Sequence, residues 1–234
     1  MKAANKGMVR TGGRRPHMPD VRAIDMGLIV SAYPKNILTD WHRFDSQVKG
    51  PPPRAFGFLD DTGEVNRFAA RYRLARSFSS VTFDSYSSVT ISGYEGLLRL
   101  FFVWSAFEQF LKITKRKQSS IESDLHRYDT RKLLQLLRTA DPGNRFLLFV
   151  HDRTNQSHKK HLKSYFTGQE CNVTYLASAI RHVFVHGSLT PSADQTPPGN
   201  VKRICDLLSK FLLSVMDKEF TRHMDEFDEM MRTL

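Results

Sequence analysis

From Asn66 onward, apolar residues recur at the spacing of one helix face, with polar residues between them. The first such pattern places Phe68, Tyr72 and Ala75 on one side of a basic amphipathic helix. Further helices are expected over residues 94–114, from Asp129 or Thr130 to Asp141, from Asn172 as N-cap to Gly187, and from Asn200 into an acidic tail. Helices joined by short loops are typical of a bundle, so we expect an all-α fold.

Three segments have patterns that leave their structure open. Residues 77–90 are rich in Ser and Thr, which predicts a loop or a short pair of strands. Residues 146–150 form an apolar run that is too short to separate a helical turn from a strand. Residues 156–166 are polar and basic, and Gly168 ends that segment.

The first sixty residues differ in composition from the rest of the chain. Lys and Arg outnumber Asp and Glu there, and the run Pro51-Pro52-Pro53 interrupts any regular element. We expect residues 1–60 to form a basic, partly irregular and partly disordered N-terminal extension with little core of its own. Residues 61–234 then form the helical domain.

Charge and cysteine content narrow the class of protein. The chain carries 35 Lys and Arg against 24 Asp and Glu, a formal net charge of +11, which favours nucleic acid or an anionic membrane surface as partner. Only Cys171 and Cys205 are present, both in apolar segments, so we expect buried free thiols. Neither a signal peptide nor a membrane span is visible, and we expect a cytoplasmic protein without a membrane partner.

Polar residues gather at the end of the apolar helix that precedes Gly187. In one interpretation they cap the helix: His186 suits the negative end of the dipole, and Gly187 takes a left-handed conformation. In a second, His182 and His186 share a helix face and bind a metal, although no further ligand lies within this helix. In a third, Arg181 binds phosphate while a histidine moves a proton near neutral pH.

The third interpretation agrees with a family resemblance. Arg181, His182 and His186 match the Arg-x4-His motif of the HEPN superfamily, in which Asn, Asp or His directly follows the Arg. As in that superfamily, the motif lies near the end of one helix, before a loop at 187–199 and a long final helix. The resemblance covers about residues 90–225 and implies a HEPN-like helical bundle.

HEPN proteins commonly form homodimers, and many are endoribonucleases that need no metal or other cofactor. The resemblance therefore implies RNA cleavage by 2′-hydroxyl attack, with His186 moving the proton and Arg181 stabilising the phosphorane. These residues lie about 140° apart around an ideal helix, so either the last turn loosens or the site is composed across a dimer axis. Prokaryotic members are often toxins of toxin–antitoxin or defence systems, which makes a nucleotidyltransferase-like antitoxin a candidate partner.

Two residues are candidates for supporting roles at the motif. The early helix of prokaryotic HEPN proteins often carries an inward polar or acidic residue, for which Glu108 is the candidate and Glu95 the alternative. We expect Glu108 to pair with Arg181 and orient it rather than to act as a base. His182 either orients His186, binds phosphate or is a surface histidine.

The segment 112–163 holds 13 Lys and Arg against five Asp and Glu and supports an RNA partner. The candidate RNA-binding residues are Lys115, Arg116, Lys117, Lys159, Lys160 and Lys163. A solvated basic face explains the same residues, so the alternative function is a non-catalytic helical bundle that binds nucleic acid or a protein partner. The acidic tail at 217–230 either pairs with the basic extension, contacts a partner or is solvated.

Overall fold

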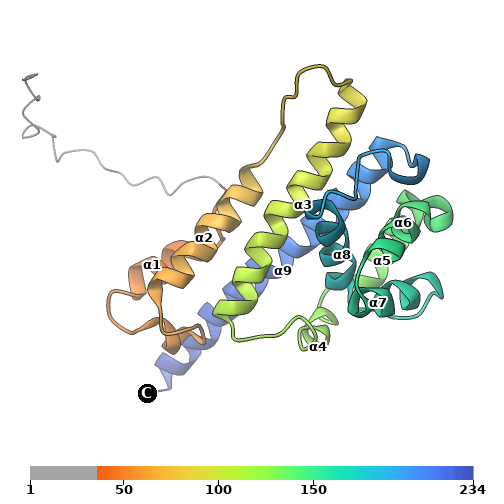
Figure 1. Cartoon of the computed structure of the whole chain (residues 1–234). Helices are drawn as coiled ribbons and strands as arrows, with labels where there is room; N and C mark the ends of the chain where they lie inside the picture. Colours follow the sequence, from red (N-terminus) through yellow and green to blue (C-terminus); the bar gives the residue numbers. More distant parts are fainter. Residues whose placement is uncertain (1–35, 234) are drawn as a thin grey trace, which may run out of the picture. The chain divides into compact units, whose positions relative to one another are not determined.

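Helices and their connecting loops make up residues 36–233, the part of the chain that this computed structural model describes (Figure 1). That part contains no strand, so the expected all-α fold class is confirmed. Its α-helices are α1 (Trp41–Gln47), α2 (Thr62–Ser77), α3 (Ser88–Ile113), α4 (Glu122–Leu125), α5 (Thr130–Ala140), α6 (Arg145–Arg153), α7 (Gln156–Phe166), α8 (Val173–Val185) and α9 (Pro198–Arg232). Short 3-10 helices in the connections are η1 (Pro53–Phe56), η2 (Pro142–Asn144) and η3 (Ala193–Gln195).

The two longest helices, α3 and α9, pack along each other at the centre of the fold (Figure 1). α2 packs against α3, while α8 contacts both α3 and α9. α6 and α7 pack against α8, and α5 packs against α9, on one side of the central pair (Figure 1). Fully buried side chains such as Leu100, Phe107 and Phe220 fill the core between these helices.

Polar side chains start most of the longer helices. The N-cap residues Asp61, Ser87, Asp129, Asn155 and Asn172 each accept a hydrogen bond from a backbone N–H in the first turn of α2, α3, α5, α7 and α8. These N–H groups have no partner within their own helix, so each cap satisfies a donor that would otherwise depend on solvent. The predicted N-cap role of Asn172 is confirmed.

The structure resolves the segments whose pattern was ambiguous. Residues 78–87 form a loop without strands, and α3 begins at Ser88, earlier than the expected start at Tyr94. Residues 146–150 lie inside α6, and the polar segment 156–166 forms α7. The helices predicted from periodicity are present as α2, α3, α5, α8 and α9.

Residues 36–60, which we assigned to the N-terminal extension, pack into the core of the helical domain. The ring of Phe44 is fully buried and lies 5.3 Å from Phe56, 5.9 Å from Phe58 and 5.8 Å from Phe220 of α9, measured between centroids. These aromatic side chains find their apolar partners on the distant helix α9, so the segment needs no core of its own. Residues 1–35 of the expected extension lie outside the described residues.

Acids of the C-terminal tail form contacts within the chain. Asp217 accepts hydrogen bonds from the backbone N–H and the hydroxyl of Thr39, at 2.7 and 2.8 Å. Arg43 of α1 lies 2.9 Å from Asp225 and 2.6 Å from Asp228, both on α9. Of the alternatives for the tail, pairing with a basic residue of the first sixty is therefore observed for these two acids.

Cys171 and Cys205 are both buried and free, as expected. Burial raises the pKa of both thiols, so they stay protonated and unreactive near neutral pH. Among residues 36–233, no helix combines the length and the apolar character that crossing a bilayer requires.

Candidate active site at the end of α8

The end of α8 turns the chain sharply after His186. Gly187 adopts φ 74°, in the left-handed region that glycine occupies without steric cost. Its N–H donates to the Phe184 carbonyl at 3.0 Å, and the N–H of Ser188 donates to the Val183 carbonyl at 3.1 Å. These two bonds form a Schellman cap, so the predicted role of Gly187 is confirmed and His186 stands exposed at the last position of the helix.

Arg181 lies one turn earlier on α8 and faces α3. Its guanidinium is 3.9 Å from the carboxylate of Glu108, so the expected pairing is present as a long ion pair. Glu108 is at the surface, with 48% of its side chain exposed, rather than pointing inward as expected. The Nε of Arg181 is buried without a hydrogen-bond partner in the described structure. The side chain is 32% exposed, and 3.9 Å is too long for a hydrogen bond, so the terminal Nη donors of Arg181 can bind another group.

His182 and His186 stack one above the other along α8, as their spacing predicts. Their ring centroids are 4.5 Å apart in an edge-to-face arrangement. Burial lowers the pKa of His182, and the neighbouring His186 and Arg181 lower it further because they disfavour a second positive charge. His182 is therefore uncharged near neutral pH.

A third histidine, which the sequence did not single out for this site, lies behind His182. His158 of α7 has its ring centroid 5.8 Å from that of His182. Its Nδ1 is 3.0 Å from the hydroxyl of Thr154, and its Nε2 forms a short hydrogen bond with the hydroxyl of Ser178. Burial, followed by His182 and His161, lowers the pKa of His158 to about 4. It is a neutral, hydrogen-bonded support for the half-buried His182, which in turn contacts the exposed His186.

One pattern in the sequence indicates the position of His158. His158, Leu162 and Tyr165 have i, i+4, i+7 spacing and form the buried face of α7. This stripe is hard to recognise in the sequence for two reasons. The residues between its members are polar, and two of its three members, His158 and Tyr165, carry polar groups themselves. Only the packing of α7 on α8 brings His158 to the motif.

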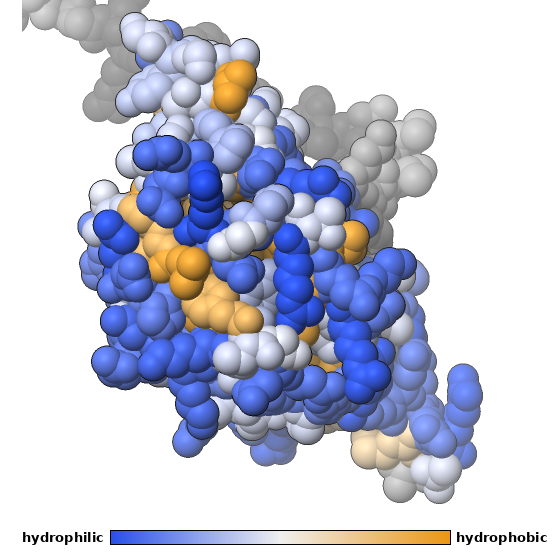
Figure 2. All heavy atoms as spheres, turned by 90° about the vertical axis from the view of Figure 1, so that its right-hand side faces the viewer, coloured by the Kyte–Doolittle hydropathy of each residue, from blue (hydrophilic) through white to orange (hydrophobic). Residues whose placement is uncertain are grey.

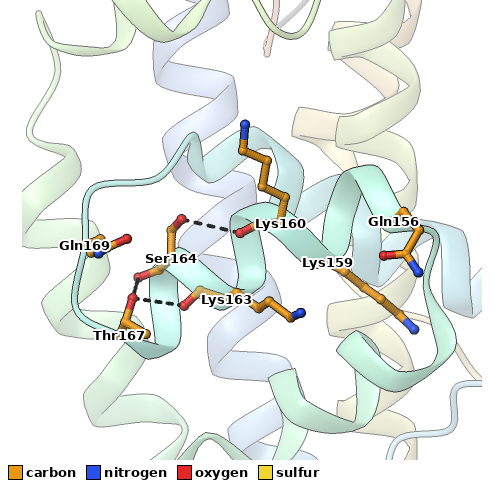
Figure 3. Close-up of a pocket in the computed structure, with 7 residues that line it drawn as sticks. All are labelled: Gln156, Lys159, Lys160, Lys163, Ser164, Thr167 and Gln169. Carbon is orange, nitrogen blue, oxygen red and sulfur yellow. Dashed lines mark hydrogen bonds between the residues drawn. The ribbon is translucent and has the colours of Figure 1, made fainter.

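The structure separates the six candidate RNA-binding residues. Lys159, Lys160 and Lys163 line an open groove of about 410 Å³ on α7 (Figure 3). Lys115 and Lys117 are exposed in the loop after α3. Arg116 lies between them but points inward, where its Nη1 is 2.8 Å from Glu219 and 3.2 Å from Asp124. Arg116 is thus engaged in ion pairs within the fold, and only three of the six candidates, Lys159, Lys160 and Lys163, share one basic groove.

The two ends of the motif have different contacts. Arg181 faces Glu108 of α3, whereas His186 contacts His182 on its own helix. The last turn of α8 keeps its hydrogen bond from the His186 N–H to the His182 carbonyl, so the helix does not unwind to bring His186 toward Arg181. The last turn thus keeps Arg181 and His186 on different sides of α8.

Within residues 36–233, no three His, Cys, Asp or Glu side chains are grouped as ligands for one metal ion. The pair His182 and His186 thus has no third protein ligand in the described structure.

The face that carries α5, α6 and α7 is largely hydrophilic, with a limited hydrophobic patch (Figure 2). Comparison of the chain with models of protein families, with curated proteins and with solved structures found no match.

Proposed function

We propose that the protein is a metal-independent endoribonuclease whose site is formed by Arg181 and His186 across a homodimer. The observation that carries the proposal is the exposed end of α8. A partly exposed arginine with an unpartnered Nε lies there one turn before an exposed histidine. A fixed cation beside a titratable ring is what cleavage of a phosphodiester requires. The match to the HEPN motif supports the same activity.

The proposed reaction is a transesterification within the RNA strand. His186 of one protomer takes the proton from a ribose 2′-hydroxyl, and the oxygen forms a bond to the adjacent phosphorus. The bond from phosphorus to the 5′-oxygen breaks, and the partner's His186 donates a proton to that oxygen. Arg181 stabilises the charge of the pentacoordinate intermediate. The products are a 2′,3′-cyclic phosphate and a 5′-hydroxyl, so DNA is not a substrate.

The neighbours of the two residues have positioning roles in this proposal. Glu108 restrains the guanidinium of Arg181 through the long ion pair. Because this ion pair is long and exposed to solvent, Arg181 can still bind a phosphate. His182 is kept uncharged by burial and by adjacent cations, so its ring packs against His186 without adding a repulsive charge. The same uncharged ring separates His186 from the buried His158.

RNA cleavage in EDTA tests the proposal directly. We expect the wild-type dimer to cleave single-stranded RNA and to leave cyclic phosphate ends, which product analysis by mass spectrometry detects. Arg181→Ala and His186→Ala should each lower the rate about 10²- to 10³-fold or more, because each removes a group that acts in the transition state. Arg73→Ala and His126→Ala, which replace exposed residues of the same types elsewhere, serve as matched controls.

A dimer that leaves RNA intact in EDTA would contradict the proposal, as would equal rates in the wild type and both site variants. The groove with three lysines favours a second function, a non-catalytic RNA-binding bundle. That function predicts salt-dependent RNA binding that persists in both variants, with no cleavage by any form. If the protein is the toxin of a toxin–antitoxin pair, expression alone should arrest growth, and Arg181→Ala should relieve the arrest.

A further inference from the structure

We propose that the outer face of α7 is a binding groove for the phosphodiester backbone of single-stranded RNA, with Lys159, Lys160 and Lys163 contacting its phosphates. The proposal deepens the proposed function, on which the identity of the strand as substrate rests. It assigns phosphate contacts to one of the two groups of candidate RNA-binding residues, the group on α7.

The two faces of α7 have different roles. One face packs on α8 through His158, Leu162 and Tyr165, which are buried. The opposite face carries Gln156, Lys160, Lys163 and Thr167 at i, i+4, i+7 and i+11, with Lys159 beside them. This face therefore presents a continuous polar stripe over the whole helix, about 17 Å at 1.5 Å per residue.

The charge of the groove has no counterpart in the described structure. Its lining contains three lysines and no Asp or Glu. Elsewhere in residues 36–233, acidic residues form ion pairs with Arg43, Arg116 and Lys202. Within the same residues, no ion pair involves Lys159, Lys160 or Lys163. Figure 3 shows Lys159 and Lys163 extending to the same side of α7. Unpaired ammonium groups one helical turn apart suit the successive charges of a polyanion.

The uncharged residues of the groove suit ribose as well as phosphate. Ser164 and Thr167 donate their hydroxyl hydrogens to the carbonyls of Lys160 and Lys163, at 3.4 and 3.2 Å (Figure 3). Their oxygens keep lone pairs that accept a hydrogen bond from a ribose 2′-hydroxyl. The amide groups of Gln156 and Gln169 add donors and acceptors at the two ends. The groove can therefore contact both repeating units of an RNA backbone.

The groove lies on the side of α7 that faces away from α8. The ring of His158, in the first turn of α7, lies 5.8 Å from His182. Lys159 and Lys160 directly follow His158 in the chain, whereas Lys163 lies one turn further from the motif. The N-terminal end of α7, with Lys159 and Lys160, is thus the end of the groove that lies nearer to the motif. The groove of about 410 Å³ is open along one helix face, so a single strand can lie along it.

Binding of an uncleavable RNA tests the groove separately from catalysis. The probe is a short single-stranded 2′-O-methyl RNA with a fluorophore, which keeps the phosphates that the lysines contact but lacks the 2′-hydroxyl donor. Its dissociation constant is measured by anisotropy at several salt concentrations. The triple variant Lys159→Gln/Lys160→Gln/Lys163→Gln should bind about tenfold more weakly or worse. The salt slope should fall by about 2, since each lost phosphate contact removes about 0.7. The matched control replaces the exposed residues Lys49, Lys132 and Lys210 by Gln.

The outcomes distinguish this proposal from the proposed function. Weak binding by the groove variant together with unchanged binding by Arg181→Ala/His186→Ala supports the groove, even if no form cleaves RNA. Equal losses in the groove variant and in the control variant would show a general charge effect and overturn the proposal. Equal affinity of the wild type for duplex RNA of the same length would overturn the single-strand assignment. Circular dichroism melts of each variant confirm that it is folded.

Discussion

At the scale of single residues, Glu219 is the clearest case of a side chain whose role depends on distant partners. Its side chain is 1% exposed and accepts hydrogen bonds from Arg116 at 2.8 Å, Arg222 at 2.6 Å and Tyr128 at 2.9 Å. Burial alone would raise the pKa of Glu219, but the bonds from Arg222, Arg116 and Tyr128 outweigh it and lower the pKa to about 2. Glu219 thereby fixes Arg116 away from solvent.

Replacing Glu219 by Gln should therefore destabilise the protein. The variant keeps the shape of the side chain but loses the charge that its donors require, so we expect a loss of about 1.5–3 kcal/mol in the free energy of unfolding. Urea denaturation monitored by circular dichroism measures this loss. Glu229→Gln, an exposed position on the same helix, is the control and should change little. Equal stability of the two variants would contradict the role of Glu219.

At the scale of elements, two glycines of α3 allow this helix to pack closely against α9 and against the loop that precedes α9. A Cβ at Gly96 would lie 2.6 Å from the Cα of Lys202, and a Cβ at Gly93 would lie 2.5 Å from the Cβ of Pro191. Side chains cannot relieve the first contact, because the atom that it meets belongs to the backbone of α9. The length of α3 follows from its local pattern, but this close approach does not.

Gly96→Ala should accordingly separate the two central helices. We expect a loss of about 1–3 kcal/mol or more, although alanine favours the helix itself by up to about 1 kcal/mol. Thermal unfolding measures the change. The control is Gly199→Ala in the first turn of α9, where a Cβ would meet nothing within 4 Å. That variant should be neutral or slightly stabilised, and a similar loss in both would refute the close-packing argument.

At the scale of the whole molecule, two buried histidines connect stability to pH. Burial, with help from neighbouring charged or titratable groups, lowers the pKa of His158 and of His223 to about 4. In the unfolded chain both titrate near their ordinary value of about 6.5. Between these values the unfolded state binds more protons than the folded state, so stability decreases as the pH falls from about 6.5 to about 4. Glu219 adds a further loss as the pH falls from about 4.5 to about 2.

We therefore expect the free energy of unfolding to be nearly constant between about pH 7 and pH 8 and to decline steeply between pH 6.5 and pH 4. In the double variant His158→Gln/His223→Gln the decline over this range should be shallower, whatever its stability at pH 7. Urea denaturation series at several pH values measure both curves. Parallel curves for the wild type and the variant would show that other groups cause the decline.

Local signals account for much of what could be predicted at the motif. Periodicity within a few turns predicted α2, α3, α5, α8 and α9, since the spacing of apolar residues on one helix depends on that helix alone. The N-cap Asn172 and the C-terminal Gly187 were predictable for the same reason, because each cap is completed within one turn. The pairing of Arg181 with Glu108 followed from a lone acid on an apolar helix that needed a basic partner.

What the sequence by itself determined is thus the all-helical class, the five helices with clear periodicity and the residues at the end of α8. It did not determine the start of α3 or the helical state of α6 and α7. Only the tertiary structure decided which polar groups are buried together. Arg116 and Glu219 are 103 positions apart, and Thr39 and Asp217 are 178 apart. No pattern along the chain encodes such pairs, because they depend on how separate helices pack. The same packing brought Phe44 into the core and His158 behind His182, and left the three lysines of α7 facing solvent.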